Sequence, residues 1–189
     1  MAPLRVVAGE ARGRQLRAPP GRSTRPTSDR VREAIFDVLG SMAAVEHAVV
    51  GDLFAGSGAL GIEALSRGAQ HASFVDQDKR AVATIRANLL ATGLGARSQV
   101  VRADVLRWLE HAAPLDLVLC DPPYAYDRWP ALLGALLGVA RLVLLETGHA
   151  LDLGGAWEVL NLKQYGGTVV TVARPADEPA RGADRKGDT

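Results

Sequence analysis

A tetrapeptide suited to chemistry on an amino group lies at residues 121–124, Asp-Pro-Pro-Tyr, directly after an apolar run. The exocyclic amine of a nucleobase is a poor nucleophile because its lone pair is delocalised into the ring. Two acceptors can draw that amine out of conjugation: the Asp121 carboxylate and a backbone carbonyl of Pro122 or Pro123. Tyr124 offers a face on which the base can stack, worth ~1 to 3 kcal/mol. In the competing interpretation, the prolines only end a strand.

A glycine loop at residues 51–61, Gly-Asp-Leu-Phe-Ala-Gly-Ser-Gly-Ala-Leu-Gly, indicates a nucleotide-like ligand. Gly56, Gly58 and Gly61 give a G-x-G-x-x-G frame, which permits a tight turn and a close approach of ligand to backbone. Asp76, at the end of the next apolar run, can accept hydrogen bonds from ribose hydroxyls. The frame fits both a nicotinamide dinucleotide and S-adenosylmethionine.

Asp52 favours S-adenosylmethionine of the two, because a carboxylate beside the glycine turn attracts an ammonium and a sulfonium and repels a pyrophosphate. Asp104, after the third strand-like run, can accept a hydrogen bond from an adenine amino group or cap the helix that follows. Both interpretations of Asp104 remain open, and we expect no metal. The predicted cofactor-binding residues are Asp52, Phe54, Ala55, Gly56, Ser57, Gly58, Asp76, Gln77, Asp104 and Val105.

Alternating strands and helices must position these residues. Short apolar runs predict strands at 49–54, 72–75, 98–101, 115–120 and 142–145, with helices between them at 60–67, 79–90, 105–111 and 129–137. Runs at 156–162 and 168–173 predict an antiparallel hairpin. Strands separated by such helices build right-handed βαβ units, which bind ligands beyond the carboxyl ends of the strands. The predicted fold class is α/β, a Rossmann-like, mostly parallel sheet of seven strands with a C-terminal antiparallel hairpin.

The formal net charge of +1 conceals a split along the chain. Residues 1–32 hold eight arginines and two acidic residues, a charge of +6, and the remainder carries −5. Such an arm can bind the phosphates of a nucleic acid, although a solvated arginine-rich surface has the same composition. The arginines predicted to contact RNA are Arg12, Arg14, Arg22, Arg25, Arg30 and Arg32.

Length and composition limit the class of protein further. The 189 residues suffice for one domain with a small appendage, and no apolar run approaches the ~20 residues of a bilayer span. The single cysteine, Cys120, forms no internal disulfide, and no apolar signal segment is seen, so we expect a cytoplasmic protein. We expect a basic arm at 1–26 (a short β-hairpin and a loop), a catalytic domain at 27–174 including a leading helix, and a disordered tail at 175–189.

Three segments together resemble the RsmD family of S-adenosylmethionine-dependent methyltransferases. Residues 25–36 resemble the family's R-P-T-x-D-R-V-R-E signature, residues 52–68 its cofactor loop and residues 121–124 its catalytic motif. The resemblance covers residues 5–174 and implies methyl transfer to the N2 amine of a guanine in 16S rRNA. It further implies that the arm and first helix contact RNA, and that a monomer acts on a partly assembled small ribosomal subunit.

Three other functions fit parts of the pattern. The Asp-Pro-Pro-Tyr motif also serves adenine-N6 or cytosine-N4 methylation of DNA. The glycine frame alone fits an NAD-dependent dehydrogenase, and a protein that binds RNA without catalysis would also have the basic arm. The resemblance favours the rRNA methyltransferase over these alternatives.

Overall fold

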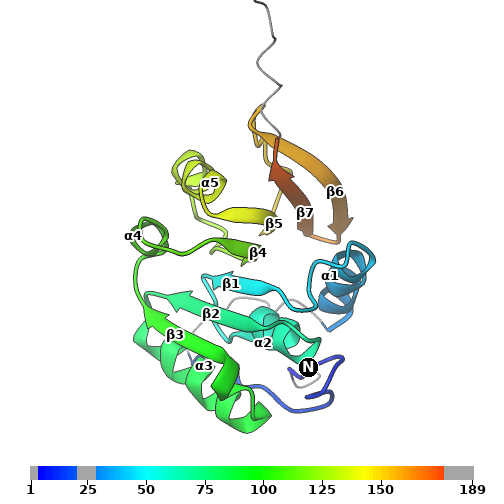
Figure 1. Ribbon diagram of the computed structural model, residues 1–189, viewed down its shortest axis with the longest axis vertical. Helices are drawn as coiled ribbons and strands as arrows, with labels where there is room; N and C mark the ends of the chain where they lie inside the picture. Colours follow the sequence, from blue (N-terminus) through cyan, green and yellow to red (C-terminus); the bar gives the residue numbers. More distant parts are fainter. Residues whose placement is uncertain (1–3, 21–28, 177–189) are drawn as a thin grey trace, which may run out of the picture.

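Seven strands form one mixed sheet in the computed structural model, which describes residues 4–20 and 29–176 (Figure 1). The strands are β1 Val49–Leu53, β2 His71–Asp76, β3 Ser98–Arg102, β4 Leu115–Cys120, β5 Ala140–Thr147, β6 Trp157–Tyr165 and β7 Thr168–Pro175. Their order in the sheet is β3-β2-β1-β4-β5-β7-β6. Strands β1 to β5 are parallel, and β7 runs antiparallel to both β5 and β6. The predicted fold class and C-terminal hairpin are confirmed.

Helices cover both faces of the sheet. They are α1 Asp29–Ser41, α2 Ala59–Ser66, α3 Lys79–Thr92, α4 Val105–Leu109 and α5 Trp129–Leu137, with a 3-10 turn at Gly95–Arg97. Helices α1, α2 and α3 lie on one face, and α4 and α5 lie on the other (Figure 1). Within the described ranges, no helix is long and apolar enough to span a membrane.

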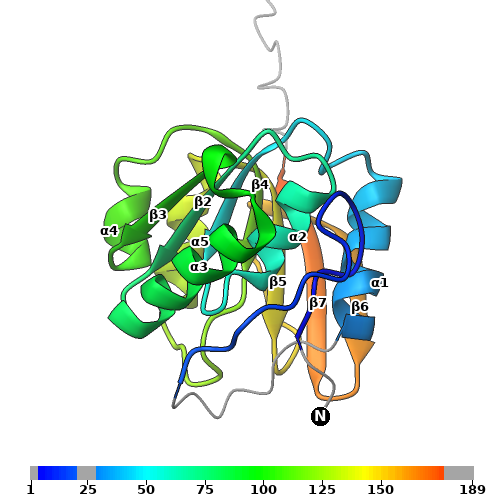
Figure 2. The ribbon, with the colours of Figure 1, turned by 90° about the horizontal axis from the view of Figure 1, so that it is seen from below.

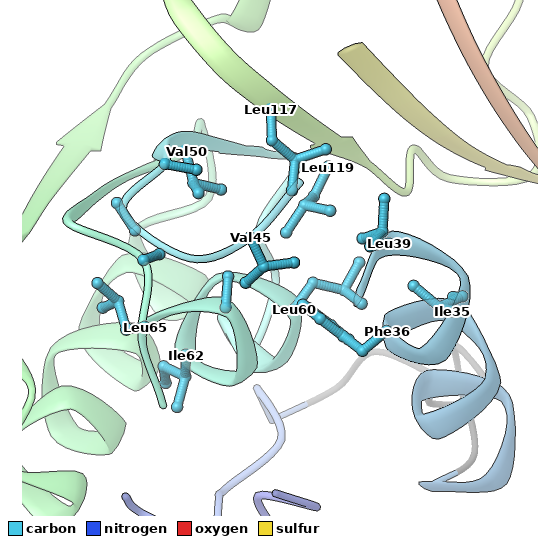
Figure 3. Packing of buried hydrophobic residues seen from close by; sticks show 14 of the residues in the cluster. Ile35, Phe36, Leu39, Val45, Val50, Leu60, Ile62, Leu65, Leu117 and Leu119 are labelled. Carbon is cyan, nitrogen blue, oxygen red and sulfur yellow. The ribbon is translucent and has the colours of Figure 1, made fainter. Parts of the chain in front are cut away.

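A hydrophobic core fills the space on each side of the sheet. On the first face, Ile35 of α1 and Ile62 of α2 belong to one buried cluster with Leu117 and Leu119 of β4 (Figure 3). The opposite cluster contains Leu132 of α5 and the alternate residues of β4. Because β4 is buried on both faces, its residues 117–120 form a continuous apolar run, and the predicted boundaries of the strand agree with the structure.

Several predicted boundaries are wrong by a few residues. Strand β5 extends over Ala140–Thr147 rather than 142–145, and the helix predicted at 105–111 ends at Leu109. Pro175 belongs to β7 rather than to the tail, and Ala176 N still donates to the Ala156 carbonyl at 2.9 Å. The rest of the predicted tail lies outside the described residues.

Residues 4–20 lie along α2 and α3 rather than projecting from the body (Figure 2). The two strands predicted in the arm are reduced to an isolated antiparallel bridge between Arg5 and Gln15, supported by a bond from Leu16 N to the Leu4 carbonyl at 2.8 Å. Val6 and Leu16 are buried against the body. The burial of these apolar side chains therefore holds residues 4–20 against the body, and strand pairing within the segment contributes little.

The buried carboxylate of Glu63 in α2 anchors the N-terminal segment. Val7 N and Ala8 N donate to its two oxygens at 2.7 and 2.9 Å. Arg67 Nε donates to Oε1 at 2.8 Å, and Arg32 Nε lies 3.7 Å from Oε2. Two arginines and two amides offset the cost of burying this charge.

Arg32 has a structural role. Its side chain is 1% exposed, which leaves little of it for an external phosphate, and its contact with RNA stays a prediction. Nη2 donates to Asp29 Oδ1 at 2.9 Å and to the Arg5 carbonyl. Arg32 therefore ties α1 to the N-terminal segment, which the charge pattern alone could not reveal.

We expect Glu63→Ala to lower the free energy of unfolding by about 3 to 5 kcal/mol, because it removes a negative charge beside the buried Arg32 and leaves two backbone amides without their acceptor. Denaturant titration followed by circular dichroism measures this. Glu46→Ala is the matched control, since the Glu46 side chain is 76% exposed, and it should change stability little. Equal stability of Glu63→Ala and the wild type would contradict the anchoring role.

Candidate active site

The loop after β1 makes the tight turn that its glycines predict. Phe54, Gly56 and Gly58 have positive φ angles of 57°, 55° and 75°. Gly58 N donates to the Ala55 carbonyl at 2.6 Å, which closes the turn before α2. A left-handed phenylalanine costs roughly 1 to 3 kcal/mol and is found mainly where a functional geometry is enforced by its surroundings.

Two buried carboxylates hold this loop in place. Asp76 Oδ2 accepts from Gly56 N, and Asp52 Oδ2 accepts from Gly61 N, both at 2.9 Å. Each aspartate is 2% exposed. A carboxylate oxygen can accept a second hydrogen bond, so these structural bonds leave both side chains able to bind a ligand.

The electrostatics at Asp52 fit a cationic ligand. Burial raises the pKa of Asp52 well above its usual value, the Gly61 N–H lowers it in part, and the charges of Asp121 and Asp76 raise it further. A positive group beside this carboxylate would stabilise its ionised form. The ammonium of S-adenosylmethionine is such a group, and a pyrophosphate is not.

A solvent-open pocket lies between the glycine loop and the tetrapeptide. The predicted site residues that it brings together are Asp52, Phe54, Ala55, Gly56, Ser57, Asp121, Pro122, Pro123 and Tyr124. The predicted cofactor residues that do not line it are Gly58, Asp76, Gln77, Asp104 and Val105. Gly58 continues the lining loop, and the other four follow or end β2 and β3.

Asp104 acts as the cap of α4. Its Oδ1 accepts from Leu106 N at 3.0 Å and from Arg107 N at 3.2 Å. Its Oδ2 lies 3.9 Å from Arg128 Nη1. The helix-cap interpretation is confirmed, and an adenine contact remains a prediction.

The Asp121 side chain lies on the same side of the sheet as Asp52 because of the register between β1 and β4. Asp52 of β1 is paired with Leu119 of β4, two residues before Asp121. Side chains alternate along a strand, so Asp52 and Asp121 belong to the same face of the sheet. Leu145 of β5 is paired with Cys120, which aligns Glu146 with Asp121 on the other side. Three carboxylates on neighbouring strands therefore line one pocket.

The tetrapeptide at residues 121–124 leads into a turn, and Gly148 lies near its tyrosine. The Pro123 carbonyl accepts from Tyr126 N at 2.8 Å, so Pro122 offers the better candidate for the second acceptor. The Tyr124 side chain is 69% exposed. A Cβ on Gly148 would lie 3.2 Å from Cδ1 of that ring, so a side chain at this position would press against Tyr124.

No sequence motif identified the end of β5 and the turn that follows it. A second, smaller pocket lies across the tetrapeptide and is lined on its other side by Trp129, Glu146, Thr147, Gly148 and His149. Glu146 also lines the first pocket and is 7% exposed. An acidic residue ending an apolar strand next to that of Asp121 was the available signal.

The predicted RNA-binding arginines have different outcomes. Arg12, Arg14 and Arg30 are exposed. Arg22 and Arg25 lie outside the described residues, and Arg32 is buried. The exposed three can reach an external polyanion, and their contact with RNA stays a prediction.

The Cys120 thiol is a poor candidate for a nucleophile. Cys120 is fully buried, and this burial raises the pKa of its thiol well above its usual value, as do the charges of Asp121 and Asp52. A thiol with a raised pKa is a weak nucleophile at neutral pH.

In the part of the chain that the structure describes, no group of three or more histidine, cysteine or acidic side chains could hold a metal ion.

Known proteins are similar to this chain in sequence and in fold. The chain is 45% identical over 134 residues to YlbH, a candidate rRNA methyltransferase of Bacillus subtilis, covering 69% of this chain and 72% of that one. It is 40% identical over 122 residues to ribosomal RNA small subunit methyltransferase D of Escherichia coli, covering 64% and 60% respectively. The structure of yhhF, a candidate methyltransferase of Escherichia coli, superposes with a TM-score of 0.81 at 29% identity, over 94% of this chain and 100% of that one.

A family model matches most of the chain. The family described as "Conserved hypothetical protein 95" matches residues 4–174. This range includes the N-terminal segment, the glycine loop, the tetrapeptide and the C-terminal hairpin, so the segments that carried the resemblance fall within it. The chain belongs to this family, that of the RsmD-type methyltransferases.

Proposed function

We propose that this protein transfers the methyl group of S-adenosylmethionine to the N2 amine of a guanine in small-subunit ribosomal RNA. The observation that carries the proposal is the position of Asp121 to Tyr124 in the wall of the pocket that the glycine loop also lines. The relatives named as rRNA methyltransferases support RNA as the substrate. Membership in this family argues against the dehydrogenase that the glycine frame alone allowed.

The cofactor would lie along the carboxyl edge of the sheet. Asp52 is proposed to hold the ammonium of the methionine moiety, and Asp76 the ribose hydroxyls. Asp104 and the backbone at Val105 are proposed to face the adenine. When bound, S-adenosylmethionine supplies a methyl group on a positively charged sulfur, which an amine can attack without a metal.

The protein's part in catalysis is alignment and polarisation. Asp121 and the Pro122 carbonyl are proposed to accept hydrogen bonds from the two N–H groups of the target amine, which turns its lone pair towards the methyl group. Tyr124, exposed beside them, would stack against a base that has left its helix or loop. Correct alignment of amine and methyl carbon supplies much of the rate.

Contacts to RNA are proposed to extend from the site along the basic face of the N-terminal segment, through Arg12, Arg14 and Arg30. An assembled or partly assembled small subunit as substrate, a monomeric state and a cytoplasmic location belong to the same proposal. Catalysis at one guanine in a large RNA requires such contacts, since one base offers too few groups to select a site.

Gly61→Ala should weaken S-adenosylmethionine binding about tenfold or more, because the new Cβ would lie 2.5 Å from Cε1 of Phe74 and 2.9 Å from Asp52 Oδ2. Isothermal titration calorimetry measures the affinity. Gly134→Ala in α5 is the control, because a Cβ there meets no atom within 4 Å. Unchanged affinity in Gly61→Ala would count against a cofactor held at Asp52.

Asp121→Ala and Asp121→Asn should slow methyl transfer by roughly 10²- to 10³-fold, the usual effect of removing one polarising hydrogen bond. The measurement is single-turnover incorporation of labelled methyl into small-subunit rRNA. Binding of S-adenosylmethionine should change little in either variant. Asp127→Ala, an exposed aspartate of the same loop, is the control. Near-normal rates in both Asp121 variants would refute the mechanism.

Replacing Arg12, Arg14 and Arg30 by glutamine should weaken RNA binding and reduce its salt dependence, with the logarithmic slope falling by about one for each phosphate that the variant no longer binds. Filter binding at several salt concentrations measures both quantities. Arg141→Gln, an arginine exposed at 82% on β5, is the single-charge control. An unchanged slope in the triple variant would show that these arginines do not bind phosphates.

A further inference from the structure

We propose that Glu146 selects guanine as the target base by accepting a hydrogen bond from its N1–H. This inference rests on the proposed function and deepens it, since it assigns base selection to a residue that no sequence motif identified.

Glu146 lies beside the catalytic aspartate by strand register. Leu145 and Cys120 are paired in the parallel ladder of β5 and β4, so the residues that follow them, Glu146 and Asp121, are neighbours at the carboxyl edge. Adjacent strands are about 4.8 Å apart. Two carboxylates at that spacing can accept from neighbouring N–H groups of one base, Asp121 from the amine and Glu146 from the adjacent ring N–H.

The pockets show which side of Asp121 the base would occupy. The larger pocket reaches the glycine loop, where the cofactor is proposed to bind, and the smaller one does not. Both are lined by Glu146 and by residues 121–124, so these residues form the boundary between them. A base in the smaller pocket would present its amine to the cofactor across this boundary.

The second pocket has the features of a base site. It contains the aromatic side chains of Tyr124 and Trp129. In the turn after β5, Thr147 Oγ1 donates to the His149 carbonyl at 2.6 Å, and a Cβ added to Gly148 would lie 3.2 Å from the Tyr124 ring. Glu146 lies directly before this turn and is 7% exposed.

Guanine is the base whose amine stands next to a ring N–H. Its N1–H donates a hydrogen bond that a carboxylate can accept. Both N2–H groups would remain for Asp121 and the Pro122 carbonyl. Adenine and cytosine carry an unprotonated ring nitrogen beside the amine, and its lone pair would face the Glu146 carboxylate, which repels it. A buried acceptor that loses its donor is strongly disfavoured.

The test uses small subunits assembled from rRNA that carries either guanosine or 2,6-diaminopurine riboside at the methylated position. Both bases have the N2 amine, but diaminopurine has an acceptor at N1 where guanine has a donor. We expect the wild type to prefer guanosine by about 10- to 100-fold in kcat/KM. In Glu146→Gln the amide can donate to the diaminopurine N1, so this preference should fall by a similar factor and diaminopurine should be methylated faster than by the wild type.

Glu146→Asp keeps a carboxylate and should retain a preference for guanosine at a lower rate. Glu110→Gln, an exposed glutamate at the end of α4, is the matched control and should keep the wild-type ratio. The affinity for S-adenosylmethionine and the midpoint of thermal unfolding, measured for every variant, identify any loss caused by misfolding. Comparing the ratio of two substrates in one variant removes such losses from the result.

The outcomes separate this inference from the proposed function. If the wild type methylates no guanosine in these particles, the proposed function fails. If the wild type methylates guanosine and Glu146→Gln keeps the full preference over diaminopurine, the assignment of Glu146 is wrong while the proposed function stands. A lower rate with an unchanged ratio would likewise reduce Glu146 to a purely structural residue.

Discussion

The register of β1, β4 and β5 places the carboxylates of Asp52, Asp121 and Glu146 side by side, and the site depends on this placement. Gathering three acidic groups is unfavourable, and the raised pKa of Asp52 reflects burial together with its acidic neighbours. A raised pKa means that the folded protein takes up a proton more readily than the unfolded chain, so stability from this group is lost as pH rises through the folded-state pKa. A cationic cofactor at Asp52 would recover part of that stability.

The described part of the basic N-terminal segment is fixed to the body and does not form a free arm. The described part of the N-terminal segment is anchored at Glu63 and carries Leu4, Ala18 and Pro19 into the wall of the larger pocket. Its exposed arginines therefore lie on a fixed surface, and Arg32 points inward to the ion pair with Glu63. Fixed charges on this surface can orient an RNA relative to Asp121, which a flexible arm would do less well.

Local patterns were sufficient to predict the fold and much of the site. Apolar runs separated by helices predicted the sheet, and the glycine frame predicted a turn that Phe54 and Gly56 make. The side of the strand to which Glu146 belongs could not be predicted, because it depends on pairing with a strand distant in sequence. The burial of Arg32 was likewise invisible, because its partner Glu63 lies 31 positions further along the chain. The contact of Gly148 with Tyr124 has no local signal at all.

Product identity tests the central claim most directly. The protein would be incubated with S-adenosylmethionine labelled in the methyl group and, in parallel, with small-subunit particles, free rRNA and duplex DNA. Each nucleic acid would then be digested to nucleosides and separated by chromatography with mass detection. The account predicts label in N2-methylguanosine from small-subunit rRNA, at one position. Label in N6-methyladenine or N4-methylcytosine from DNA, with none in guanosine, would contradict it.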